Sequence, residues 1–363
     1  MTTTQAIGDR RVIGGVDTHG ATHHGAALDA ATGKLLGDRE FPATAKGYQQ
    51  LLVFLRGYGT VLKVGVEGTG SYGAGLFRHL DNSGVEVIEV SRPNRQARRL
   101  QGKSDPIDAI NAARAVLAET ATTIPKPRDG AVEAIRLIRS TRRSAVKARR
   151  AAIAQMHGLL FGGPEELRAK LAGFDRAALV ARCARLRPDP AGSLRDPAHA
   201  AKVMLRRLAR RVHALDVEIA EADSELAELI QATAPSVLAV FGAGTEAAGQ
   251  LLTTAGEHPH RLHSEAALAR LCGVAPIPAS SGNTTRHRLH RGGDRAANSA
   301  IHMIVINRLR WHQPTQTYLA RRTTEGKTKK EIIRCLKRAV VRELYTALKT
   351  DLPNPPKPSP ITA

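Results

Sequence analysis

The alternation of apolar and polar positions changes along the chain and divides it into regions of different secondary structure. In the first third, short apolar-rich segments lie between polar or glycine-containing turns, which is typical of strands, and stretches with helical spacing separate the later ones. The predicted strands are Arg11–Asp17, His23–Asp29, Lys34–Phe41, Val61–Glu67 and Val85–Val90, and the predicted helices are Thr44–Tyr58 and two that begin near Ser71 and Ser104. Strands that first follow one another directly and are later linked through helices predict a mixed sheet with helices on its faces.

Helical spacing replaces the strand signals from Asp129 to about Thr233. Apolar residues recur there at alternating spacings of three and four, as in the a/d seam of a coiled coil. These residues are Leu205, Leu208, Val212, Leu215, Ile219, Ala222, Leu226 and Leu229. We therefore predict a helical coiled-coil region whose partner is either the earlier helix, around Ile135 and Met156, or another subunit. A helix packed in a globular bundle is the alternative.

The last part of the chain predicts a mainly helical domain. Helices are expected at Ser264–Leu271, Asp294–Trp311 and Thr328–Lys349, and Phe241–Leu252 has the Gly-x-Gly turn and following helix of a helix-hairpin-helix element. The proline-rich end of the chain is expected to be disordered. The predicted domains are residues 1–125, 126–234 and 235–349, followed by a tail at 350–363.

Charge is distributed unevenly over these regions. The chain of 363 residues has 54 Lys and Arg against 33 Asp and Glu, a formal net charge of +21. The net charge is +2 over residues 1–125, +8 over 126–234 and +11 over 235–363. Clustered Lys and Arg side chains gain free energy by releasing counterions from phosphates, so the later regions are expected to bind nucleic acid. The low aromatic content of 3% argues against an amphipathic membrane-binding face.

Membrane insertion and secretion are not expected. No segment approaches the run of about 18 apolar residues that a membrane span needs, and the N-terminal sequence lacks a secretory apolar region. We therefore expect a cytoplasmic protein without membrane partners. The three cysteines, Cys183, Cys272 and Cys335, are far apart and outside any CxxC pair. We therefore expect each of them to be a small buried apolar residue, and we expect neither a disulfide framework nor a zinc site.

Acidic residues stand at two predicted strand ends and in one helical turn. Asp17 closes the first strand and Glu67 closes the strand before the second helix, so in a ribonuclease-H-like sheet their carboxylates would lie side by side. Asp105 and Asp108 are three residues apart at a predicted helix N-terminus and share one helix face. Carboxylates this close repel one another unless divalent cations neutralise them, and oxygen-only ligands favour Mg²⁺ or Mn²⁺. We expect these four residues to hold metal ions for phosphoryl transfer.

Several segments resemble a known family. VIGGVDTHG, GVEGTGSYG and GKSDPIDA together resemble the DEDD motif of the insertion-sequence-110 family of transposases, and GVAPIPASSG followed by RGGDRAANSAIH resembles the C-terminal transposase domain of that family. The resemblance covers most of the chain and implies a ribonuclease-H-like (RuvC-like) first domain. Carried over residue by residue, it implies that Asp17, Glu67, Asp105 and Asp108 are the catalytic metal-binding acids.

The resemblance also implies a catalytic group in the C-terminal domain. A serine of PASSG would be the nucleophile, and the Ser-Gly pair of the family best matches Ser281 and Gly282, with Ser280 as the alternative. Such a serine would attack a DNA phosphate and keep the energy of the phosphodiester bond in a serine–DNA link. The family further implies excision and site-specific insertion of a mobile element, donor and target DNA and a non-coding bridge RNA as partners, and assembly as dimers and tetramers.

Basic residues near this serine are candidates for phosphate contacts. Arginines flank two glycines there, which would let guanidinium and backbone groups approach phosphates closely. The candidates are Arg286, Arg288, Arg291 and Arg295 and, in the last predicted helix, Lys329 and Lys330. His19, His23 and His24 lie near Asp17, but no cysteine pair or HExxH motif accompanies them, so we expect surface or DNA-facing roles rather than zinc binding.

Two other functions fit the same residues. One is a metal-dependent nuclease or Holliday-junction resolvase that hydrolyses DNA with water as the nucleophile. The other is a non-catalytic nucleic-acid-binding protein in which the four acids are incidental. A D-D-E integrase is disfavoured because Asp105 and Asp108 are closely spaced and no obvious acidic partner follows them.

Overall fold

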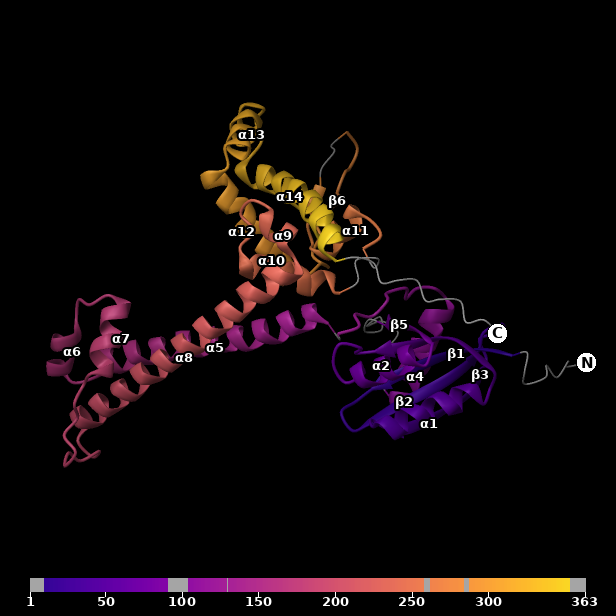
Figure 1. The fold of residues 1–363 in the computed structure, drawn as a ribbon, viewed down its shortest axis with the longest axis horizontal. Helices are drawn as coiled ribbons and strands as arrows, with labels where there is room; N and C mark the ends of the chain where they lie inside the picture. The colour runs from indigo at the N-terminus through magenta and orange to yellow at the C-terminus, as the bar shows by residue number, and fades with distance from the viewer. Residues whose placement is uncertain (1–9, 91–103, 129, 258–261, 284–286, 353–363) are drawn as a thin grey trace, which may run out of the picture. The chain divides into compact units, whose positions relative to one another are not determined.

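The chain folds into two compact units in a computed structural model that describes residues 10–90, 104–128, 130–257, 262–283 and 287–352 (Figure 1). Unit 1 is Met1–Pro127 and unit 2 is Arg128–Ala363. The further division of unit 2 at residue 234 stays a prediction.

Unit 1 is built on a mixed five-stranded sheet with the order β3-β2-β1-β4-β5. Its strands are β1 (Arg11–Thr18), β2 (Thr22–Asp29), β3 (Leu35–Pro42), β4 (Thr60–Glu67) and β5 (Glu86–Val90). β1 to β3 form an antiparallel meander, whereas β4 runs parallel to β1 and β5 runs parallel to β4. The predicted mixed sheet is therefore confirmed.

Helices cover both faces of this sheet. α1 (Ala45–Arg56) and α2 (Ala74–Asn82) pack on one face, and α4 (Asp105–Leu117) packs on the other. Successive residues of a strand point to opposite faces, so each strand supplies both cores. Val64 and Val66 of β4 pack with α1 and α2, whereas Ile13 of β1 packs with the alanine-rich face of α4.

Two glycines let α4 lie directly against the backbone of the sheet. A Cβ atom on Gly15 of β1 would stand 2.2 Å from the carbonyl oxygen of Ala109 and 2.3 Å from the amide nitrogen of Ala113. A Cβ atom on Gly65 of β4 would stand 2.8 Å from the carbonyl oxygen of Ala112. Real Cβ atoms do not approach so closely, so only glycine fits at these two positions. The contact fixes the height of α4 above β1 and β4.

Unit 2 contains a long antiparallel pair of helices, α5 (Ala131–Phe161) and α8 (Pro197–Thr233) (Figure 1). Two ion pairs show the direction of the pairing, because Arg142 bonds to Asp223 and Arg149, further along α5, bonds to Asp216, further back on α8. α6 (Glu165–Leu171) and α7 (Arg176–Ala184) stand between the two long helices in sequence and pack with them in a separate apolar core.

The predicted heptad seam lies on the inner side of α8. Leu205, Val212, Ala222 and Leu226 are buried, and the other four predicted seam positions are partly buried. Residues of this seam share cores with residues of α5, such as Met156. The partner of the seam in this chain is therefore the earlier helix, while coiled-coil geometry stays a prediction.

The remainder of unit 2 is mainly helical and shares one apolar core with the ends of α5 and α8. Its elements are α9 (Pro235–Ala239), α10 (Thr245–Ala255), α11 (Glu265–Leu271), β6 (Pro276–Pro278), β7 (His287–Leu289), α12 (Arg295–Trp311), α13 (Gln313–Thr324) and α14 (Lys329–Asp351). The sequence predicts α11, α12 and α14, but not α9, α13 or the two short strands. α10 follows a glycine-containing turn, and its assignment to a helix-hairpin-helix element stays a prediction.

The last helix extends further than the sequence predicts. Helix α14 passes the predicted boundary at residue 349, because the Asp351 carboxylate accepts the amide hydrogens of Ser236 and Val237 and holds this end of the helix against α9. The predicted tail otherwise falls on residues 353–363, which lie outside the described residues.

Cys183 and Cys272 are buried as expected, but the expectation for Cys335 was wrong, because it is exposed.

None of the helices in the described ranges combines the length and the apolar character that a membrane crossing requires.

Adding one methyl group at Gly15 tests the contact between α4 and the sheet. Gly15→Ala forces the helix away from β1, and overpacking of this kind costs about 1–3 kcal/mol of unfolding free energy. Hydrogen–deuterium exchange should show faster exchange in peptides from β1 and α4. Gly20→Ala is the matched control, because its Cβ atom would meet the Tyr72 ring at 3.5 Å, an ordinary contact distance. Equal exchange in the two variants would contradict the close packing.

Candidate functional site

Asp17 stands near the end of β1 on the sheet face that α4 covers. Its neighbour Val16 points to the opposite face and packs with the core of α1 and α2. Only 7% of Asp17 is exposed to solvent. A carboxylate at the edge of an apolar core is desolvated, so its charge must be balanced by the groups around it.

The first turn of α4 brings two more carboxylates to Asp17. Asp105 is the first residue of α4, and Asp108, one turn later, is only 2% exposed. The positive end of the helix dipole lies at this turn and favours negative charge there. The close packing of α4 over Gly15 sets this turn beside the end of β1.

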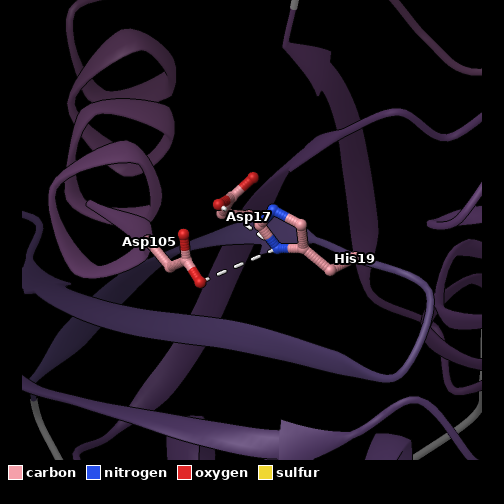
Figure 2. A group of neighbouring side chains, drawn as sticks. All are labelled: Asp17, His19 and Asp105. Carbon is pink, nitrogen blue, oxygen red and sulfur yellow. Dashed lines mark ion pairs between the residues drawn. The ribbon is translucent and has the colours of Figure 1, made fainter. Parts of the chain in front are cut away.

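His19 completes a compact group with Asp17 and Asp105 (Figure 2). One ligand atom from each of the three side chains lies within 4.8 Å of the other two. Nδ1 of His19 is 3.7 Å from Oδ2 of Asp17 and 3.9 Å from Oδ2 of Asp105. The group is large enough for one cation to be shared by all three side chains.

The pKa of Asp17 is raised above its ordinary value, and burial is the main cause. The charges of Asp108 and Asp105 raise this pKa further, whereas His19 and the backbone of Thr18 lower it. Two neighbouring carboxyl groups therefore disfavour the charged form of Asp17 at the end of β1. Such a cluster favours the binding of a divalent cation.

Glu67 ends β4, the strand parallel to β1, at the same edge of the sheet. The hydroxyl of Thr18 donates a 2.8 Å hydrogen bond to the backbone oxygen of Glu67 and ties the two strand ends together. Because side chains alternate along a strand, Glu67 and Gly65 share the face that α4 covers. The structure thus brings all four predicted acids to one edge, with Asp17 and Asp105 in the compact group and Glu67 and Asp108 outside it. Their catalytic roles stay predictions.

Of the three histidines near Asp17, His23 departs from the expected surface or DNA-facing role. His23 is fully buried, and its ring stacks on Tyr48 at a centroid distance of 5.5 Å, so that expectation was wrong for His23. Nε2 of His24 lies 2.7 Å from Oδ2 of Asp38. His19 belongs to the acidic cluster, which the sequence analysis missed. The spacing Asp-x-His carries the signal, because residues two apart in extended backbone point to the same side.

The predicted nucleophile lies in the loop of a short hairpin in unit 2. β6 and β7 pair antiparallel, and Ser280 and Ser281 fall in the loop that joins them. Both serines are exposed. Gly282 has a φ of +54°, a conformation that favours glycine and turns the chain directly after Ser281. The hairpin therefore presents the Ser281 hydroxyl to solvent.

The base of this serine hairpin is held by contacts between the two chain segments that flank it. A Cβ atom on Gly293 would stand 2.2 Å from the amide nitrogen of Gly273, so the two glycines pack backbone to backbone. Asn298 donates from Nδ2 to the carbonyl oxygens of Cys272 (3.1 Å) and Gly273 (2.9 Å), and it accepts a 2.7 Å hydrogen bond from Nζ of Lys337. The segments RGGD (residues 291–294) and AAN (residues 296–298) thus anchor the serine hairpin.

The basic candidates for phosphate contacts are exposed where the structure describes them. These are Arg288, Arg291, Arg295, Lys329 and Lys330. Arg286 lies outside the described residues. Binding of nucleic acid by any of them stays a prediction.

Comparison with known proteins gives two family matches and one curated relative. Residues 14–162 match the IS110-type DEDD transposase family, and residues 235–320 match the transposase IS116/IS110/IS902 family. The "Insertion element IS900 uncharacterized 42 kDa protein" of Mycobacterium paratuberculosis is 28% identical over 152 residues, which is 41% of this chain and 38% of that protein. The chain therefore spans well under half the length of this curated relative. The first family match contains all four acids, and the second contains the serine hairpin.

Asp17→Asn is predicted to stabilise the metal-free protein and to remove its stabilisation by divalent cations. Because the pKa of Asp17 is higher in the folded than in the unfolded state, the ionised carboxylate opposes folding at neutral pH, and this cost disappears as the pH falls below both values. A cation at one hundred times its Kd adds about 2.7 kcal/mol of stability, which the variant should lose.

Thermal unfolding with and without Mg²⁺ or Mn²⁺ measures both effects. Asp81→Asn, an exposed change on α2, is the control that should leave both unchanged. A cation-dependent shift of the same size in Asp17→Asn would contradict the assignment of Asp17.

Asn298→Ala is predicted to loosen the serine hairpin. The change leaves two backbone carbonyls and the Lys337 ammonium without their side-chain partner, at a cost of about 1–3 kcal/mol. Limited proteolysis should cut the segment between β6 and β7 faster than in the wild type. Asn307→Ala changes an exposed asparagine of the same helix and should leave the rate unchanged. Identical rates in both variants would show that Asn298 does not anchor the hairpin.

Proposed function

Because the chain belongs to the IS110 family of transposases, we propose that it is a DNA recombinase that excises a mobile element and inserts it at specific sites. The observation that carries the proposal is the meeting of the carboxylates of Asp17 and Asp105, with Asp108 beside them, at the end of β1. An architectural DNA-binding protein has no need of a buried carboxylate beside two others. A phosphoryl-transfer enzyme uses them to hold a divalent cation.

The donor set fits such a cation. Carboxylate oxygens bind Mg²⁺ and Mn²⁺. Burial and the neighbouring carboxylates raise the pKa of Asp17, which supports a cation here because a positive charge would favour its ionised form. Asp17 and Asp105 would be ligands, with Asp108 and Glu67 as the further acids of this edge. When bound, the cation would offset negative charge on the phosphate that reacts. The residues of unit 1 would set the position of the cation. Helix α4, which covers the strands, would exclude water from one side of the site.

Unit 2 contributes the nucleophile in this proposal. The oxygen of the Ser281 hydroxyl attacks a DNA phosphorus atom, so that a serine–phosphate bond forms while the bond from phosphorus to one sugar oxygen breaks. The serine loses its proton, and the departing sugar oxygen takes up a proton. Attack by a hydroxyl of another strand reverses these steps and joins that strand to the phosphate. The number of phosphodiester bonds is conserved, so strand exchange needs no external energy source.

The partners of the proposed recombinase are donor and target DNA and a non-coding bridge RNA. The net charge of +11 over residues 235–363 and the exposed Arg288, Arg291 and Arg295 beside the serine hairpin support binding of a polyanion. The bridge RNA and the assembly into dimers and tetramers rest on the resemblance to the family.

Ser281→Ala separates a recombinase from a nuclease that uses water. The variant should lose covalent protein–DNA adducts and strand exchange completely while still binding DNA. The assay mixes the full chain, a divalent cation, RNA transcribed from beside the gene and end-labelled DNA that carries an element end, and it resolves adducts on a denaturing gel.

Ser280→Ala is the matched control, because the two serines are adjacent in one exposed loop. It should retain adducts and exchange. Loss in Ser280→Ala alone would move the nucleophile to that residue, and hydrolysis that survives in both variants would favour the nuclease.

A further inference from the structure

His19 lies outside the set of four acids, yet its side chain faces two of them. It directly follows β1, and its backbone amide donates a 3.0 Å hydrogen bond to the carbonyl oxygen of Thr22, which closes the turn between β1 and β2. Figure 2 shows the ring edge that carries Nδ1 directed at the carboxylates of Asp17 and Asp105. The closed turn therefore fixes the backbone of His19, from which the ring reaches the carboxylate oxygen atoms.

The distances from Nδ1 of His19 to the two carboxylates are compatible with ligands around one ion. Nδ1 is 3.7 Å and 3.9 Å from the two carboxylate oxygens, which is too long for hydrogen bonds of good geometry. Ligands that bind one ion at about 2.0–2.2 Å stand roughly 3 Å apart at neighbouring positions and roughly 4.3 Å apart at opposite ones. Both distances fall between these limits, and all three donor atoms lie within 4.8 Å of one another, so small side-chain adjustments would let one ion contact all three.

An ion pair alone does not account for this arrangement. The side chains of His19 and Asp105 are 45% and 44% exposed. Exposed pairs of opposite charge contribute little free energy, and their side chains gain nothing from a shared geometry. A common ligand gives all three side chains a reason to converge.

We propose that His19 is a nitrogen ligand of the cation held by Asp17 and Asp105, and that this site therefore prefers Mn²⁺ to Mg²⁺. The inference rests on the cation site of the proposed function and adds the identity of the ion. Mg²⁺ strongly prefers oxygen ligands, whereas imidazole nitrogen binds first-row transition ions more tightly. One imidazole among carboxylates shifts the preference toward Mn²⁺ without excluding Mg²⁺.

Pulsed electron paramagnetic resonance of the full chain loaded with Mn²⁺ tests the ligand directly. A directly bound imidazole gives ¹⁴N modulation of the Mn²⁺ signal, which does not depend on catalytic activity. The wild type should show this modulation, and His19→Gln should lose it. His213→Gln, an exposed change on α8, should leave it intact.

Calorimetry of the same proteins measures the preference between the ions. His19→Gln should weaken Mn²⁺ binding by about tenfold, the scale of effect for groups that tune metal sites, and change Mg²⁺ binding by much less. His19→Asp, which offers oxygen in place of nitrogen, should restore binding and move the preference toward Mg²⁺.

The outcomes distinguish failure of this inference from failure of the cation site. If the wild type binds Mn²⁺ in an Asp17-dependent manner but shows no ¹⁴N modulation, His19 is not a ligand, while the carboxylate site stands. If Asp17→Asn binds Mn²⁺ as tightly as the wild type, both the inference and the proposed cation site are overturned. Absence of ¹⁴N modulation in the wild type overturns the inference even if a variant fails to fold.

Discussion

The packing of α4 onto bare backbone at Gly15 and Gly65 is the contact on which the rest of unit 1 depends. With a side chain at either glycine, the helix would have to rise from the sheet, and Asp105 and Asp108 would move away from Asp17. The alanines of α4 serve the same purpose from the helix side, because Ala109, Ala112 and Ala113 are almost fully buried and add little thickness. Small residues on both surfaces thus let the helix lie close enough to the sheet to bring the carboxylates together.

This arrangement of carboxylates lowers the stability of the folded protein. Desolvation of Asp17 and repulsion from its acidic neighbours raise its pKa, so the charged cluster costs free energy in the folded protein. The helix N-terminus and His19 offset part of this cost. A native state that retains such a conflict is typical of a functional site, because a side chain chosen for stability alone would be neutral there. A positively charged ligand would relieve this conflict.

The sequence predicted the parts of this site that follow from periodicity and missed those that follow from turn geometry. Strand alternation and the order of the elements placed Asp17 and Glu67 at one sheet edge, and the helical spacing of Asp105 and Asp108 placed them on one face. The spacing Asp-x-His places His19 on the same side as Asp17, whereas the closed turn after β1, whose conformation no local pattern specifies, sets the backbone of His19. The burial of His23 depends on the ring of Tyr48 from α1, a partner distant in sequence. β6 and β7 are three residues each, too short for a period to be recognised, and they form because the flanking segments at Gly273 and Gly293 meet.

The serine hairpin is tied to the long helix α5 through buried polar groups. Arg139 of α5 is only 3% exposed and donates to Oε1 of Gln250 on α10, Gln250 donates to the hydroxyl of Thr254, and that hydroxyl lies 2.7 Å from Oδ2 of Asp294. The other carboxylate oxygen of Asp294 caps α12. The backbone amide of Asp294 donates to the carbonyl oxygen of Leu271 at the hairpin base. Rotation of α5 against α10 would leave a buried guanidinium without its partners, a large penalty. A continuous series of hydrogen bonds therefore connects the base of the serine hairpin to α5.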